Sequence, residues 1–255
     1  MKIKVIIRII VLTIVVPFVF LSASPAPITQ EEADEIVMEY ISREVQLYSV
    51  FSKEDIQVGA TITTFTGEAL ELDYPCRVYY VSYTGETDNN VGYYLVVNES
   101  NGNVLEINAK NDAGPEDLAE WRMVLDMTAI DFNNIQNLYE QPLPVIQKCV
   151  QGRWKLDTLF GGITGFYPVD DLGIFIEING NKWYGEEFQW KKHTAQWPNG
   201  NSFKTYVIQG IDEPSPWVFC ASIKNDSLAV GYPSFYVFPT PCYDCYTGEL
   251  WIRTK

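Results

Sequence analysis

The residue types best suited to redox chemistry stand near the end of the chain, at Cys242 and Cys245. Their Cys-x-x-Cys spacing is that of dithiol redox motifs, in which a following helix N-terminus activates the attacking thiol. Here Pro239 and Pro241 precede the pair, and a strand-like run, "YTGELWIRT", follows it. We therefore expect a local disulfide or two inert thiols. The five cysteines, which permit two disulfides and leave one thiol over, are Cys76, Cys149, Cys220, Cys242 and Cys245.

Hydrolytic chemistry requires a nucleophile beside a base, a poised carboxylate pair or a metal. The only histidine, His193, lies between charged residues in "WKKHTAQW", which is typical of a surface position. The pairs Asp170–Asp171 and Glu186–Glu187 are adjacent in sequence, so within a strand their members point to opposite faces. No Gly-x-Ser-x-Gly, His-Glu-x-x-His or phosphate-binding glycine loop is present. The sequence therefore predicts no enzyme, no cofactor and no metal site.

The charge balance restricts the partners. The 255 residues carry a formal charge of −15, and 47% of them are hydrophobic, which is sufficient for packed cores. An anionic surface disfavours nucleic acid and anionic lipid heads. This surface favours a cationic partner. The alternative is that its charge only keeps the protein in solution.

The first 24 residues have the layout of a signal peptide. Lys2, Lys4 and Arg8 precede an uncharged apolar run from Ile9 to Leu21, which is short for a transmembrane helix. The "LSAS" that ends the segment resembles the bacterial lipobox, with Ser24 in place of the lipidated cysteine. We therefore expect an exported protein, periplasmic or extracellular, that is not lipidated and has no membrane span after cleavage. An uncleaved anchor is the alternative.

The first half predicts a helix packed on an antiparallel sheet. Thr29 and Glu32 form a capping-box pattern before a helical apolar repeat that runs to Tyr48. Strand-like runs follow, and Asn101-Gly102 predicts a tight hairpin between the last two. This order resembles the cystatin-like PepSY family over residues 28–113. The resemblance implies an α+β domain, and members of this family include peptidase propeptides and inhibitors.

Residues 114–144 predict a helical connector between two domains. Apolar residues step by three and four from Leu118 to Tyr139, with no interior glycine or proline. The "QPLP" at 141–144 is expected to end this helix and to mark the domain boundary. Such a row of apolar residues along one helix face also suits a coiled coil with a partner. Packing of the helix on its own sheet is the simpler interpretation.

Residues 145–255 predict an all-β domain, an up-and-down barrel or a sandwich, because short alternating strands are separated only by turns. Gly152 and Trp154 in the first strand, with Arg253 in the last, resemble the lipocalin family. The resemblance implies a barrel whose floor is closed by the tryptophan, with the arginine stacked over it.

Alternation along the strands predicts which side chains face the barrel interior. The candidate ligand-binding residues are Leu156, Ile176, Phe203 and Val207. An eight-stranded barrel can be filled by side chains or can hold one small ligand, so both interpretations stay open. A third interpretation has a tryptophan rim or a sugar-stacking platform, made by Trp183, Trp190, Trp197 and Trp217.

We therefore expect an exported, non-enzymatic binding protein, with a small hydrophobic ligand in the lipocalin-like barrel or an exported protein as its partner. The alternatives are a peptidase inhibitor or envelope chaperone that acts through the PepSY-like domain, and a purely structural surface protein.

Overall fold

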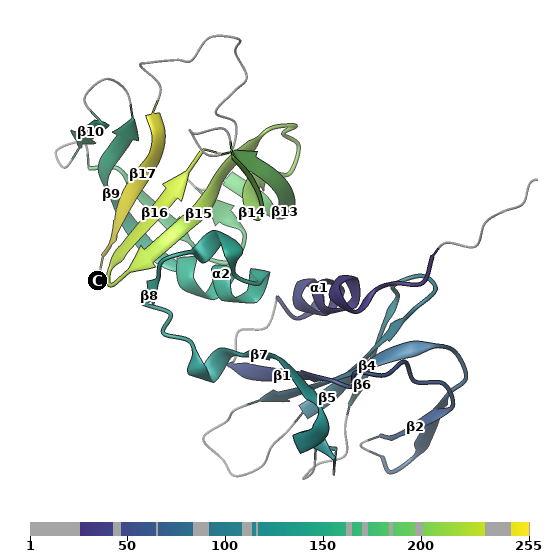
Figure 1. Ribbon diagram of the computed structural model, residues 1–255. Helices are drawn as coiled ribbons and strands as arrows, with labels where there is room; N and C mark the ends of the chain where they lie inside the picture. The colour runs from purple at the N-terminus through teal and green to yellow at the C-terminus, as the bar shows by residue number, and fades with distance from the viewer. Residues whose placement is uncertain are drawn as a thin grey trace, which may run out of the picture.

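A computed structural model describes eleven stretches of the chain (Figure 1). They are residues 26–42, 47–64, 66–83, 92–108, 114–115, 117–161, 165–169, 173–183, 186–196, 201–232 and 246–254. Several predictions concern residues outside these ranges: the signal peptide with Ser24, the pair Cys242 and Cys245, Trp197, and Asp170–Asp171. Within the described part, no helix combines the length and apolar character that a membrane span needs.

Helix α1 spans Gln30–Ile41 and begins at the predicted capping box. The Thr29 hydroxyl accepts a hydrogen bond from the backbone N–H of Glu32 at 3.2 Å, and the Glu32 carboxylate accepts one from the Thr29 N–H at 2.8 Å. These bonds satisfy donors that a helix start otherwise leaves without partners. The helix ends at Ile41, earlier than predicted, and Tyr48 instead begins the first strand.

The first half contains a five-stranded antiparallel sheet with the order β6-β5-β4-β1-β7. Its strands are β1 (Tyr48–Ser52), β4 (Cys76–Tyr83), β5 (Gly92–Asn98), β6 (Val104–Asn108) and β7 (Arg122–Asp126). The predicted hairpin joins β5 to β6, where Gly102 has a φ of 72° and donates to the Asn98 carbonyl. Side chains of α1 share a buried cluster with one face of this sheet. A separate hairpin, β2 (Ala60–Thr63) with β3 (Ala69–Leu72), packs in another cluster with Val78 and Val96.

The predicted helical connector is wrong. Residues 118–140 form three short 3-10 turns and two strands: η1 (Leu118–Glu120), β7, η2 (Met127–Ala129), β8 (Asn134–Ile135) and η3 (Leu138–Glu140). Strand β7 pairs with β1 at the sheet edge, and β8 pairs with β15 (Pro216–Lys224) in the second half of the chain. These long-range pairings override a helical apolar spacing that is only a weak local preference. The Asp126 side chain also accepts from the Thr128 N–H, a local bond that competes with helix formation.

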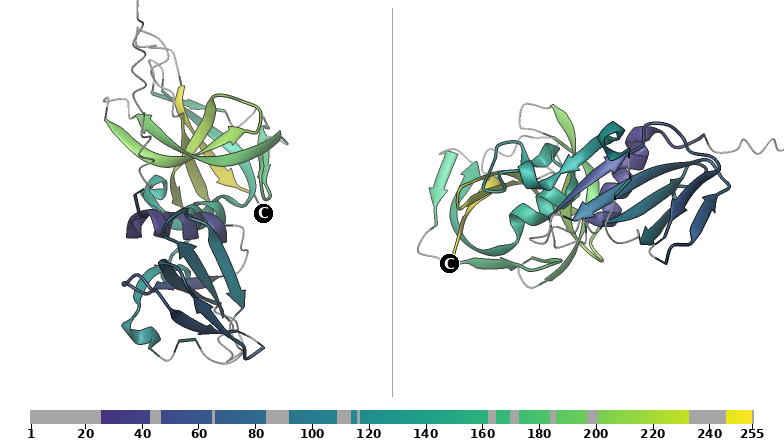
Figure 2. Two further views of the ribbon diagram at one scale, coloured as in Figure 1. Left: turned by 90° about the vertical axis from the view of Figure 1, so that its right-hand side faces the viewer. Right: turned by 90° about the horizontal axis from the view of Figure 1, so that it is seen from below.

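Helix α2, Leu143–Val150, starts where the sequence predicted a helix to stop. Pro144 stands in its first turn, where the missing N–H is no loss. The helix buries six of its eight residues, namely Leu143, Pro144, Val145, Ile146, Cys149 and Val150. Figures 1 and 2 place α1 and α2 side by side, between the five-stranded sheet and the strands of the second half.

The second half is a nearly closed, barrel-like antiparallel sheet with the order β10-β9-β17-β16-β15-β14-β13-β12 (Figure 2). The strands are β9 (Gly152–Gly161), β10 (Gly165–Pro168), β11 (Phe175–Ile178), β12 (Lys182–Trp183), β13 (Glu186–Gln196), β14 (Ser202–Gly210), β15 (Pro216–Lys224), β16 (Ser227–Gly231) and β17 (Tyr246–Arg253). The last strand, β17, pairs with β9, and β11 also pairs with β9. The first and last long strands of this half are therefore neighbours, as closure requires.

One hydrophobic cluster connects the two halves. It includes Val37 of α1, Leu95 of the five-stranded sheet, Ile146 of α2 and Trp154 of the barrel-like sheet. Because α2 contacts both α1 and β15, this helix closes one end of the barrel-like sheet and carries the core across to the first half. The two helices therefore position the side chains at the junction of the two halves.

Candidate functional site: a cleft between α1 and the barrel-like sheet

The predicted Trp154–Arg253 stack is present. The guanidinium carbon of Arg253 lies 4.4 Å from the Trp154 ring centroid, and the two residues are partners in the β9–β17 ladder. Trp154 is fully buried and its Nε1 donates to the Val150 carbonyl at 2.8 Å. Arg253 Nη2 donates to the Cys149 carbonyl at 3.1 Å. The stack therefore joins the first and last long strands of the barrel-like sheet, β9 and β17, to the end of α2.

Gly152 is required by its backbone conformation. Its φ is 127°, which side chains other than glycine rarely adopt. A Cβ placed there would meet only Arg253 Nη1, at an ordinary contact distance of 3.8 Å. The glycine is therefore required by the backbone conformation of the turn from α2 into β9, and not by a lack of room for a side chain.

Two of the four predicted ligand-binding residues lie in the main core. Leu156 and Ile176 are 4% and 2% exposed, and both belong to the cluster that holds Trp154 and Trp251. Trp183 meets Trp251 edge to face, with ring centroids 6.2 Å apart. Side chains therefore pack densely around the Trp154 end of the sheet.

The other two predicted ligand-binding residues lie on the opposite face. Phe203 and Val207 belong to a separate cluster with Tyr139 of η3 and Phe219 of β15. The next residue, Ile208, belongs to the main cluster, and neighbouring strand residues point to opposite faces. The assignment of Phe203 and Val207 to one interior surface with Leu156 and Ile176 is therefore wrong.

The described tryptophans do not form one rim. Trp183 is buried, Trp190 packs edge to face on Phe188 at 5.5 Å, and the Nε1 of Trp217 donates to Glu213. The described residues contain no group of three side chains suited to hold a metal ion. Cys76, Cys149 and Cys220 are buried free thiols, and burial raises the pKa of Cys149 to about 12 and that of Cys76 to about 11. These thiols are suited to packing and not to nucleophilic chemistry.

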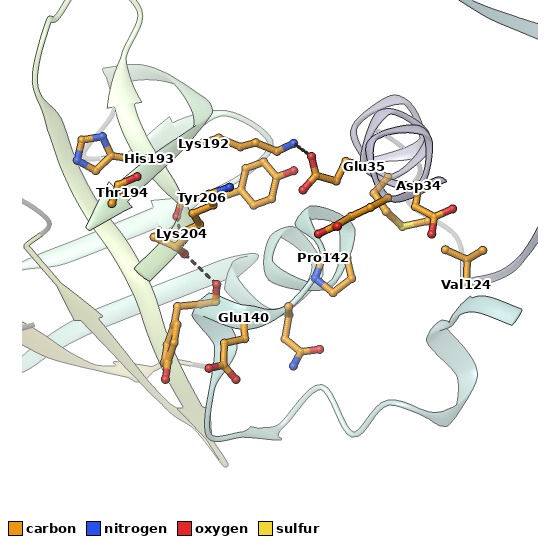
Figure 3. Close-up of a pocket in the computed structure, with 15 residues that line it drawn as sticks. Asp34, Glu35, Val124, Glu140, Pro142, Lys192, His193, Thr194, Lys204 and Tyr206 are labelled. Atoms are coloured by element: carbon orange, nitrogen blue, oxygen red, sulfur yellow. Dashed lines mark hydrogen bonds and ion pairs between the residues drawn. The ribbon is translucent and has the colours of Figure 1, made fainter. Parts of the chain in front are cut away.

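An open cleft of about 850 Å³ lies between α1, the 139–142 segment and strands β13 and β14 (Figure 3). We call it the α1 cleft. It is lined by Glu31, Asp34, Glu35, Met38, Val124, Tyr139, Glu140, Gln141, Pro142, Lys192, His193, Thr194, Lys204, Thr205 and Tyr206. Four carboxylates, two lysines and one histidine thus share the lining with apolar side chains.

The helix side of the α1 cleft is held by a hydrogen-bond network around Asp34. Arg122 Nη2 donates to both carboxylate oxygens of Asp34, at 2.8 and 2.7 Å. The Tyr79 hydroxyl donates to Asp34 Oδ1 at 2.8 Å, and Gln30 Nε2 donates to the same oxygen at 2.8 Å. Burial and the charge of Asp34 raise the pKa of Tyr79, so its hydroxyl stays a donor. Asp34 is therefore a fixed part of the wall.

The sheet side is joined to α1 by Lys192 and Tyr206. Lys192 Nζ lies 2.6 Å from Glu35 Oε2 and 3.2 Å from Glu39 Oε1, and Figure 3 shows its side chain extended toward α1. The Tyr206 hydroxyl donates to Glu39 at 3.2 Å. Burial alone would lower the pKa of Lys192, but its bonds to Glu35 and Glu39 raise it instead. We call this group of four residues the Lys192 bridge.

Other polar groups of the α1 cleft are free to meet a ligand. Glu31 on α1 and Lys204 on β14 are exposed, and neither has a hydrogen-bond or ion-pair partner among the described residues. His193 also lines the cleft, but no nucleophile lies in hydrogen-bond reach of it within the described part. The arrangement therefore offers both charged groups and apolar surface to a ligand.

The sequence alone indicates the acidic side of this cleft but not the lysine that meets it. Glu31, Glu35 and Glu39 recur every four residues, so an acidic stripe along α1 could have been read directly. Lys192 stands 157 positions after Glu35, and no local pattern connects them. No family model, curated protein or solved structure matches this chain.

Proposed function

We propose that this chain is an exported, non-enzymatic binding protein that takes its partner in the α1 cleft. In this proposal the second half is a lipocalin-like barrel and the first half is a PepSY-like α+β domain. The stacked pair of Trp154 and Arg253, together with the β9–β17 ladder, supports the first assignment. The order of one helix and an antiparallel sheet supports the second.

The observation that carries the binding site is the α1 cleft itself. Its volume of about 850 Å³ falls within the range of roughly 300–1,000 Å³ that ligand sites occupy. Its walls come from both halves of the chain, a common position for binding sites. The Lys192 bridge and the Asp34 network fix those walls before any partner arrives, so little ordering entropy remains to be lost on binding.

The lining indicates the chemistry of the partner. Of its four carboxylates, Asp34 is committed to Arg122 and Glu35 to Lys192. Glu31 and Glu140 have no ion-pair partner among the described residues, so two carboxylates stand against the one free lysine of the lining, Lys204. Met38, Val124 and Pro142 add apolar surface. The whole chain is also strongly acidic, at −15. A peptide segment of an exported protein with alternating basic and apolar side chains fits these features, because the field of the protein attracts it and the cleft covers its apolar groups.

A small hydrophobic ligand inside the barrel has less support. Leu156 and Ile176 are already packed against tryptophans, and Phe203 and Val207 face away from them. Binding in the α1 cleft is also compatible with the peptidase-inhibitor alternative, since an inhibitor and a chaperone would both hold a segment of another chain.

Fluorescence polarisation with a labelled peptide tests the proposal. The probe is a six-residue peptide of alternating lysine and leucine, and its counterpart has glutamate for each lysine. The full chain should bind the basic peptide and not the acidic one. Glu31→Lys should weaken binding about tenfold or more, because it reverses a charge in the cleft.

The matched control is Glu54→Lys, which changes an exposed glutamate outside the cleft and should leave binding unchanged. Equal loss in both variants would show that only net charge matters and would remove the site assignment. No binding of the basic peptide at millimolar concentration would overturn the proposed function and favour a purely structural protein.

A further inference from the structure

A row of carboxylates on α1 continues beyond the α1 cleft into a second cleft. Glu31, Glu35 and Glu39 stand four residues apart, so they lie on one face of the helix, about 6 Å apart along its axis. Glu31 and Glu35 line the α1 cleft, whereas Glu39 lines a cleft of about 1,160 Å³. Lys192 and Tyr206 line both clefts, so the Lys192 bridge stands between them. The bridge therefore interrupts one acidic row.

The Lys192 bridge is a complete site for one ammonium group. Lys192 Nζ lies 2.6 Å from Glu35 Oε2, 3.2 Å from Glu39 Oε1 and 5.8 Å from the centroid of the Tyr206 ring. Carboxylates and aromatic rings are the partners that proteins use for lysine and other organic cations. The occupant comes from β13 in the second half of the chain, whereas both carboxylates belong to α1. The acidic row therefore binds an ammonium group that is not part of the row.

The ammonium group in this site is exchangeable. The side chains of Lys192, Glu35 and Glu39 are 45%, 50% and 48% exposed, and exposed ion pairs contribute little net stability. When Lys192 turns to solvent, the Tyr206 hydroxyl still donates to Glu39, whose carboxylate has lone pairs for a second donor. Burial raises the pKa of Tyr206, so its hydroxyl stays protonated. Departure of Lys192 therefore leaves α1 joined to β14.

The spacing of the acidic row matches that of alternate side chains in an extended peptide. Alternate residues of an extended segment point to one face and lie about 6.6 Å apart. The carboxylates on α1 recur about every 6 Å, so three alternating lysines can stand opposite Glu31, Glu35 and Glu39. The first lysine meets Glu31, which has no partner among the described residues. The second and third lysines reach the two carboxylates that Lys192 occupies.

We propose that Lys192 occupies a site for lysine side chains of a partner, and that an extended segment with alternating lysines displaces it from Glu35 and Glu39. The bridge is then an autoinhibitory contact. A segment with one lysine engages Glu31 and leaves the bridge closed, whereas a segment with three lysines opens it and follows the acidic row into the second cleft. This assignment rests on the proposed function, because it states how the α1 cleft selects its basic partner.

Fluorescence polarisation of the full chain at low ionic strength tests this proposal with two labelled peptides. One is the six-residue peptide of alternating lysine and leucine, and the other has serine for its second and third lysines. Lys192→Met should raise the affinity for the three-lysine peptide about tenfold and that for the single-lysine peptide less than about threefold, because two further carboxylates become free. The matched control Lys204→Met removes an equal charge from the α1 cleft without freeing a carboxylate, so both peptides should gain equally and little.

A second substitution locates the gain. Glu39→Gln in the Lys192→Met background should remove most of it, whereas Glu54→Gln, at an exposed glutamate outside both clefts, should leave it unchanged. Equal gains from Lys192→Met and Lys204→Met, or equal gains for the two peptides, would overturn the autoinhibitory contact and leave the proposed function intact. Binding of neither peptide to the wild-type chain or to Lys192→Met at millimolar concentration would overturn the proposed function, and this contact with it.

Discussion

At the Trp154 end of the barrel-like sheet, the Arg253 guanidinium lies over the Trp154 indole. Beneath the start of α1, the guanidiniums of Arg77 and Arg122 instead pair with the carboxylates of Glu99 and Asp34. Arg253 stacks on Trp154 and makes one hydrogen bond to a backbone carbonyl. Arg77 instead pairs with Glu99 at 2.9 Å and donates to Gln30 at 2.6 Å, and both charged residues are less than 10% exposed. Arg77 is buried and Arg253 is half-buried, so both regions shield a cation from water but give it different partners.

The difference indicates where stability arises in each half. The apolar burial of Trp154 is a net gain, and the cation adds a modest stacking term. The pair of Arg77 and Glu99 must first offset the desolvation of two charges, so its net gain over apolar residues is small although its rupture is costly. The first arrangement stabilises the fold, and the second fixes where the start of α1 lies.

The largest effect is expected from Trp154→Ala. The change removes a fully buried indole and leaves Arg253 without its ring, so we expect a loss of about 3–5 kcal/mol in the free energy of unfolding. Urea unfolding followed by circular dichroism measures it. Trp217→Ala, at a partly exposed tryptophan, is the control and should cost clearly less. Equal losses would contradict the account of the Trp154 end.

Arg77→Met should come second, with a loss of about 3 kcal/mol, because Glu99 is left as a buried charge without compensation. The double variant Arg77→Met with Glu99→Leu should recover most of that loss, since it also removes the second charge. The same urea titration measures both. A double variant as unstable as the single one would show that the pair stabilises the fold in its own right, and the contrast between the two halves would disappear.

Arg253→Lys should cost less, about 1–2 kcal/mol, because lysine keeps the charge but loses the planar stack. A natural control exists in Arg153, whose guanidinium lies 4.8 Å from the exposed ring of Phe175. Arg153→Lys should cost under about 0.5 kcal/mol, because a solvated stack contributes little. The difference in thermal midpoint between the two variants measures the effect of burial, and its absence would contradict the shielding of Trp154.

The smallest effect is expected at the Lys192 bridge. Lys192→Met should cost less than about 1 kcal/mol, since its side chain is 45% exposed. The folded-state pKa of Lys192 is raised, so its contribution is fully present below the ordinary lysine pKa and is lost as pH rises through the folded value. Urea titrations of both proteins at pH 8 and pH 11.5 should therefore show a stability difference at pH 8 that shrinks at pH 11.5. A difference that grows with pH would contradict the bridge.

Local chemistry in the sequence predicted several elements correctly. Thr29 with Glu32 predicted the start of α1, and Asn101-Gly102 predicted the β5–β6 turn. The stack of Arg253 on Trp154, between strands about 100 residues apart, was implied by the family resemblance of Gly152, Trp154 and Arg253, and the structure contains this stack. Each of these predictions rests on residues whose conformational or packing requirement is narrow.

The predictions that failed concern residues whose structure depends on partners far away in the sequence. Residues 122–126 have helical apolar spacing but form β7, because β1 offers a ladder to pair with. Val207 and Ile208 alternate clearly, but alternation cannot say which of two apolar faces points inward when both are buried. The α1 cleft could not be predicted as a whole, since Lys192 meets Glu35 only after both halves have folded.

Hydrogen–deuterium exchange of the full chain, with and without the alternating lysine–leucine peptide, tests whether a basic segment binds in the α1 cleft. Protection reports which backbone amides become covered or stiffened. Protection should concentrate on α1 and on residues 139–142, and Glu31→Lys should abolish it. Protection confined to β9 and β11, around Leu156 and Ile176, would contradict the claim and place the site inside the barrel-like sheet.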